Sequence, residues 1–197
     1  MRTVRRVNVL SLAVVVGVLG VGVPGVGALS VSHPHATSLQ SHAVKPTMKK
    51  LAFSASYVGN VKMLFSASRV SGVMNGAGKA TVLGQGTVVA TGNTTSFSTS
   101  SASDPLSGTA VIKGSGGSLT VKAINVYAST TSSAAPTAST PDPVLVAGTV
   151  KVLKGTGKFA GATGTLSVHA TFTVSTISGN ETQKFNATLK GSLSVKA

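Results

Sequence analysis

Residues 165–175 alternate strictly between apolar and polar side chains, and this alternation constrains the fold more than any other feature. Hydroxyl-bearing residues and His169 take one face of the segment, and apolar residues take the other. The apolar face consists of Leu166, Val168, Ala170, Phe172 and Val174. A period of two fits a β-strand and is incompatible with an amphipathic helix. The segment is therefore predicted to be a strand with one face in a core.

Several other segments have the same character. Strand-like sequence recurs in residues 51–57, 61–67, 79–91, 106–114, 118–128, 144–154 and 185–195. Glycine-rich stretches separate many of them, and residues 114–117 have the composition of a hairpin turn. No segment after residue 46 shows a helical period. We therefore predict an all-β domain, a single closed antiparallel β-barrel of about eight strands, with a β-sandwich as the alternative.

The N-terminus has the three parts of a secretory signal peptide. Arginines within residues 1–6 form a positive n-region, an apolar run follows over residues 7–23, and Pro24 interrupts it. Small residues ending at Ala28 provide a cleavage site, which predicts a secreted protein, either extracellular or in the cell envelope. An uncleaved membrane anchor is the alternative, because a spanning helix needs about 20 apolar residues.

Composition divides the chain into a signal peptide (1–28), a flexible leader (29–46) and a β-barrel domain (47–197). The leader is rich in Ser, His and Pro and lacks periodicity. Within the domain, residues 128–143 are mostly Ser, Thr, Ala and Pro. Such a segment buries too little apolar surface to offset the entropy of ordering, so it is predicted to be a mobile loop. The chain has no cysteine, which excludes disulfides and thiolate metal sites.

The charge balance is strongly basic. The chain has 17 lysines and arginines against 3 acidic residues, and removing the three arginines of the n-region leaves 14 against 3, a net charge of +11. This excess favours contact with acidic envelope polymers, and it also serves to keep a secreted domain soluble. Specific nucleic-acid binding is not expected, because no basic run carries interleaved aromatic residues.

A glycine-rich run at residues 154–165, Lys-Gly-Thr-Gly-Lys-Phe-Ala-Gly-Ala-Thr-Gly-Thr, is the most distinctive motif. A phosphate-binding loop is not expected here, because no helix follows and the Lys-Ser/Thr ending is absent. We interpret the glycines as turn and bulge positions between two strands, with Phe159 closing one end of the core.

This run, with residues 143–149 before it, resembles a signature of bacterial exported proteins in the allene oxide cyclase barrel-like group. That group is related in fold to plant dirigent proteins and more distantly to calycins. The resemblance implies an eight-stranded antiparallel barrel with an apolar lumen. It does not imply the cyclase reaction, because the plant enzymes use a carboxylate and a cysteine in the lumen. This chain has no cysteine, and its one glutamate, Glu181, is predicted to lie in a turn at residues 178–182.

No constellation of residues marks a catalytic site, a metal site or a cofactor site. Asp104 precedes a proline and Asp142 lies between two prolines, so both are predicted to be loop residues. His169 belongs to the polar face of its strand and is expected on the surface. Three histidines in the leader, His33, His35 and His42, have metal-compatible spacing but lie in a flexible segment.

The function indicated by these features is that of a secreted, non-enzymatic β-barrel that binds a small apolar ligand or serves as an envelope component. The residues expected to line the lumen are Phe53, Phe65, Val168 and Phe172. A lumen-based isomerase or cyclase and a polyanion-binding surface protein are the alternatives. The scarcity of titratable residues favours binding over catalysis.

Cleavage after Ala28 predicts a mature chain that begins at Leu29. Intact-mass measurement of protein recovered from the culture medium should give this N-terminus, because a positive n-region, an apolar run and a small-residue site together direct signal peptidase. Recovery of the chain only in membranes, with residues 1–28 still attached, would favour the anchor instead.

Overall fold

The computed structural model describes residues 47–66, 69–94, 103–132 and 134–197. The predicted signal peptide (1–28) and leader (29–46) lie outside the described residues, as do the three leader histidines. The barrel domain belongs to the compact unit Val44–Ala197. Among the described residues, no helix is long and apolar enough to cross a membrane.

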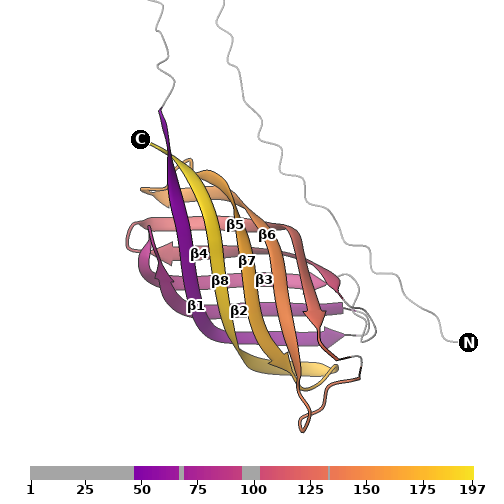
Figure 1. Cartoon of the computed structure of the whole chain (residues 1–197). Helices are drawn as coiled ribbons and strands as arrows, with labels where there is room; N and C mark the ends of the chain where they lie inside the picture. Colours follow the sequence, from indigo (N-terminus) through magenta and orange to yellow (C-terminus); the bar gives the residue numbers. More distant parts are fainter. Residues whose placement is uncertain (1–46, 67–68, 95–102, 133) are drawn as a thin grey trace, which may run out of the picture. The chain divides into compact units, whose positions relative to one another are not determined.

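Eight antiparallel strands form one closed barrel in which each strand pairs with the next along the chain (Figure 1). The strands are β1 (Met48–Ser66), β2 (Arg69–Ala80), β3 (Gly84–Thr94), β4 (Asp104–Gly114), β5 (Gly117–Thr130), β6 (Asp142–Gly157), β7 (Thr163–Val174) and β8 (Gly179–Lys196). The predicted all-β closed barrel is confirmed, and the alternative of a β-sandwich is wrong.

Pairing of β1 with β8 closes the barrel. The two strands run antiparallel along their whole length, from Met48 opposite Lys196 to Phe65 opposite Gly179. The last residues of β8 therefore lie beside the first residues of β1 (Figure 1). Closure gives every strand a neighbour on both sides, which removes the long free edges at which sheets associate with other chains.

The pleat places alternate residues inside the barrel. In β7, Leu166, Ala170 and Val174 are buried, whereas His169 is exposed. The apolar face of this strand therefore lies inside the barrel and the polar face outside, as predicted from the alternation. β1 has the same order, with Phe53, Tyr57 and other inward residues buried and the residues between them exposed. The core is thus the barrel interior, built from the inward faces of all eight strands.

Strand boundaries differ from the prediction at several places, and residues 51–57 and 61–66 belong to one strand, β1. Residues 79–91 are not one strand, because the chain turns over residues 81–83 between β2 and β3. Residues 69–78, most of β2, escaped prediction because their inward positions carry Gly72, Gly76 and Gly78, which give no apolar alternation. The segment predicted to be a loop at 128–143 narrows to residues 131–141, since pairing continues to Thr130 and resumes at Asp142.

One end of the barrel is closed by the turns between β2 and β3 and between β6 and β7. Leu83 from the first turn and Phe159 and Ala162 from the second are almost fully buried. The second turn is tight: the Ala162 amide donates to the Phe159 carbonyl at 2.9 Å, and Gly157 and Gly161 adopt φ of 60° and 74°. These φ values favour glycine. The glycine-rich motif therefore shapes a turn that buries Phe159. We call this end of the barrel, closed by Leu83, Phe159 and Ala162, the capped end.

Phe185 on β8 offers a test of core packing. Its side chain is 2 % exposed, so Phe185→Ala is expected to lower the free energy of unfolding by about 3–5 kcal/mol. The control is Leu153→Ala, at a bulge position that is 53 % exposed, which should change stability by no more than about 0.5 kcal/mol. Urea unfolding of the two variants measures both. A loss below about 1 kcal/mol for Phe185→Ala would mean that this part of the interior is not packed.

Candidate ligand-binding lumen

Side-chain size is distributed unevenly around the interior. The inward positions of β1 and β5–β8 carry mostly Phe, Tyr, Leu, Val and Met, whereas about half of those on β2, β3 and β4 carry glycine or alanine. The small inward residues are Gly72, Gly76, Gly78, Ala80, Gly86, Ala90, Gly92, Gly108 and Ala110. An eight-stranded barrel has room for packed side chains or for one small ligand. Five of these small residues, Gly72, Ala90, Gly92, Gly108 and Ala110, line the part of this room that is empty.

Two aromatic side chains fill the space beside inward glycines of β2. A β-carbon on Gly78 would fall 2.8 Å from Cδ1 of Tyr57, and one on Gly76 would fall 2.7 Å from Cζ of Phe185. Each ring therefore covers an inward glycine of β2, an arrangement that protects a glycine within a sheet. The rings occupy space that side chains of β2 would take, rather than the centre of the lumen.

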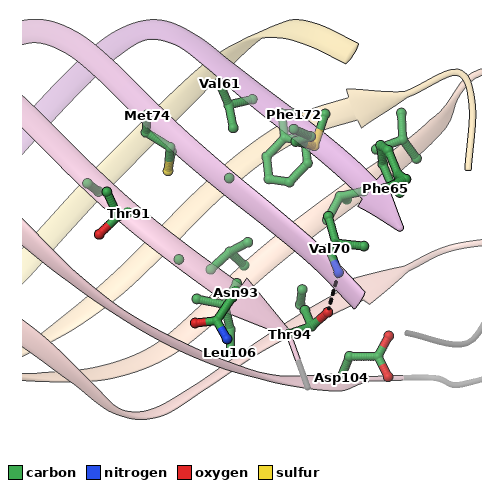
Figure 2. A pocket seen from close by; sticks show the side chains of 18 of the residues that line it. Val61, Phe65, Val70, Met74, Thr91, Asn93, Thr94, Asp104, Leu106 and Phe172 are labelled. Carbon is green, nitrogen blue, oxygen red and sulfur yellow. Dashed lines mark hydrogen bonds between the residues drawn. The ribbon is translucent and has the colours of Figure 1, made fainter. Parts of the chain in front are cut away.

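The empty space consists of two adjoining hollows. The first, of about 150 Å³, lies toward the end of the barrel opposite the cap and is lined by residues such as Phe65, Gly72, Thr94, Asp104 and Phe172; we call it the outer hollow (Figure 2). The second, of about 110 Å³, lies nearer the cap and is lined by residues such as Tyr57, Ala110, Val121, Val168 and Phe185; we call it the inner hollow.

The two hollows are neighbours within the barrel and share part of their walls. Met74, Ala90, Leu106 and Val146 line both of them. In Figure 2, Met74 and Leu106 lie on the wall of the outer hollow, from β2 and β4. The lining of both hollows is almost entirely apolar, as is typical of sites for small ligands.

Three of the four residues predicted to line the lumen line one of the two hollows, and the fourth does not. Phe65 and Phe172 line the outer hollow, and Val168 lines the inner hollow. Phe53 is buried near the capped end at 2 % exposure and is not among the residues that line either hollow. Phe159, predicted to close one end, is equally buried in the cap.

Two acidic residues lie in strands, and the prediction that they lie in loops is wrong. Asp104 and Asp142 are the first residues of β4 and β6, where Asp104 pairs with Ala128 and Asp142 with Val174. Both are buried, at 8 % and 4 % exposure, because strand pairing already begins at these positions. The hydroxyl of Thr131 donates to Asp142 at 3.1 Å. Asp104 lines the outer hollow near Thr94 (Figure 2).

Glu181 also lies in a strand, β8, and not in the predicted turn. Its Oε1 atom accepts hydrogen bonds from the Ser175 amide at 2.7 Å, the Ser175 hydroxyl at 2.6 Å and the Gln183 side-chain amide at 2.6 Å. These donors bind the start of β8 to the end of β7. Glu181 is thus engaged in the connection between two strands and lines neither hollow.

Among the described residues that line the inner hollow, Tyr57 is the one fully buried residue with a polar side-chain atom. It is 1 % exposed, and its hydroxyl has no hydrogen-bond partner among the described residues. A buried hydroxyl without a partner costs about 1–3 kcal/mol. Burial also raises the pKa of Tyr57 above its ordinary value of 10.0, so the phenol stays protonated, and able to donate, throughout the neutral range.

Acidic side chains gather at one end of the barrel, whereas basic side chains lie at both ends, with Arg69 at the start of β2 near the acidic end. Asp104, Asp142 and Glu181 all lie near the strand ends opposite the cap, at the starts of β4, β6 and β8. Exposed lysines, by contrast, include Lys79, Lys113, Lys154 and Lys158 in or beside the turns at the capped end. In the part of the chain that the structure describes, no group of three or more His, Cys, Asp or Glu residues could hold a metal ion.

Comparison of the chain with protein-family models, with curated proteins and with solved structures gives no match. The resemblance to the allene oxide cyclase barrel-like group therefore stays a prediction. The lumen has to be interpreted from its own geometry.

Proposed function

We propose that this protein is a secreted, non-enzymatic barrel that binds one small apolar molecule in its lumen. The observation that carries the proposal is the pair of adjoining apolar hollows left by the small inward residues of β2, β3 and β4. Ligand sites are typically apolar cavities with a few polar groups, and the mouths of β-barrels are a common place for them.

The size of the hollows sets the class of ligand. An engineered apolar cavity of about 150 Å³ binds benzene or xenon, and the outer hollow has about this volume. With the inner hollow added, a ligand of one ring with a short substituent, or of two small rings, is of suitable size. Transfer of such a molecule from water contributes about 0.8 kcal/mol for each buried methylene-sized group.

A lumen-based isomerase or cyclase has less support than a binding protein. General acid–base catalysis needs groups within hydrogen-bond reach of the same substrate atoms. Among the residues that line the described hollows, Asp104 faces the outer hollow and Tyr57 the inner one, so no paired groups converge on one point. The arrangement suits binding and orientation of a ligand better than proton transfer.

Gly72 provides a direct test, because it lines the outer hollow and has room for a larger residue. A β-carbon at this position would lie 3.7 Å from the Lys62 carbonyl oxygen and 3.9 Å from Cγ2 of Val61, both ordinary contacts. Gly72→Val should therefore fold, with its methyl groups in the outer hollow. It is expected to weaken binding of fluorobenzene about tenfold, since it displaces roughly two methylene-sized contacts. Fluorine NMR titration measures the affinity.

Ala77→Val is the matched control for this experiment. Ala77 lies on the same strand but on the exposed outer face, so the same side chain added there should leave fluorobenzene binding unchanged. Equal affinity of the unsubstituted protein and Gly72→Val would contradict binding in the lumen, as would a lack of saturable binding by the unsubstituted protein.

A further inference from the structure

Two buried side-chain atoms in the described part of the chain have no hydrogen-bond partner, and they differ in kind. One is Oε2 of Glu181, whose other carboxylate oxygen already accepts three hydrogen bonds. The other is the hydroxyl oxygen of Tyr57, whose side chain has no other polar atom. A buried polar group without a partner in a folded protein calls for an explanation. In Tyr57, therefore, the only polar atom of the side chain has no hydrogen-bond partner among the described residues.

Packing alone does not account for the tyrosine. The ring of Tyr57 covers Gly78 and is almost fully buried. A phenylalanine would cover the same glycine with the same ring, and it would bury no unpaired hydroxyl. The hydroxyl therefore weakens the unliganded barrel without improving its core.

Water is a poor partner for this hydroxyl. A buried water molecule is held by two to four polar groups. The other residues of the inner hollow are chiefly Val, Ala, Leu, Ile and Phe. The strands around it pair with their neighbours in the barrel, with one interruption of the β4–β5 pairing at residues 106–108 and 123–126. Thr91 and Thr109 border the hollow, but both are exposed on the outer face. The site thus offers one hydrogen-bond donor in apolar surroundings.

We propose that the Tyr57 hydroxyl donates a hydrogen bond to an acceptor oxygen of the bound molecule, so that the ligand is a compact apolar ketone, ester or ether rather than a hydrocarbon. The inference rests on the proposed function, because it concerns the same lumen. The ligand oxygen reaches the inner hollow, and its apolar body fills the outer hollow beside Phe65 and Phe172. A single donor in an apolar site fixes the orientation of the ligand and rejects analogues that lack the oxygen.

A pair of probes of nearly equal shape separates the hydrogen bond from apolar contact. Acetophenone and α-methylstyrene differ in that a carbonyl oxygen replaces a methylene group. Their affinities for the unsubstituted protein and for Tyr57→Phe can be measured by competition against fluorobenzene in fluorine NMR. Tyr57→Phe is expected to weaken acetophenone about two- to tenfold, the range of one neutral hydrogen bond, and to leave α-methylstyrene unchanged.

The chain contains a matched control, because its other tyrosine, Tyr127, is 47 % exposed on the outer face. Tyr127→Phe should change the affinity of neither probe. A second readout needs no ligand: Tyr57→Phe should retain or raise the thermal unfolding temperature, since it removes an unpaired buried hydroxyl. A marked fall in that temperature would show that the hydroxyl already has a partner in the barrel, and would overturn the inference.

The outcomes also distinguish this inference from the proposed function. If both probes bind and Tyr57→Phe changes their affinities equally, or changes neither, the lumen binds apolar molecules but Tyr57 is not a polar anchor. If neither probe displaces fluorobenzene or binds to the unsubstituted protein, lumen binding itself fails, and the inference with it. Selective loss of acetophenone affinity in Tyr57→Phe supports both.

Discussion

The structure depends on the antiparallel pairing of β1 with β8, which joins the two ends of the domain and turns a meander into a barrel. Without it, β1 and β8 would be edge strands with unpaired backbone groups, and the interior would be an exposed apolar face. With it, every strand has two neighbours and all inward side chains share one enclosed space. Because no disulfide supports the fold, backbone pairing and burial of this interior supply the stability.

Closure sets the diameter of the barrel, and side-chain size then decides how much of the interior remains empty. On β1 and β5–β8 the inward residues fill their share of the space, whereas the glycines and alanines of β2–β4 do not. The cap built around Phe159 and Leu83 closes one end. The remaining space lies between the cap and the opposite strand ends, where Asp104 and Thr94 are found. The candidate site is therefore a consequence of uneven residue size on a regular scaffold.

Alternation of apolar and polar residues was sufficient to predict an all-β fold, because strands such as β7 carry large inward side chains that make the period visible. A closed barrel was the predicted arrangement of these strands, with a β-sandwich as the alternative, and the pairing of β1 with β8 decides between them. The inward positions of Phe65, Val168 and Phe172 followed from the same pattern. β2 could not be recognised in this way, since three of its inward positions, Gly72, Gly76 and Gly78, contribute no apolar signal.

The polar groups of the lumen were the least predictable part. Asp104 and Asp142 stand next to prolines, and such local sequence indicates a loop, whereas the pairing that places them in strands comes from distant segments. Tyr57 looked like one more member of an apolar face, and only the packed structure shows that its hydroxyl has no partner there. A tyrosine on a face otherwise made of Leu, Phe and Ala was the one available signal.

The central claim is that the barrel encloses empty apolar space, and xenon tests it most directly, since xenon occupies apolar cavities without needing any polar contact. In crystals of the protein under xenon pressure, the account predicts xenon atoms within the lumen beside Met74 and Leu106, which line both hollows. A lumen without xenon, filled instead by repacked side chains of β2, β3 and β4, would contradict the account.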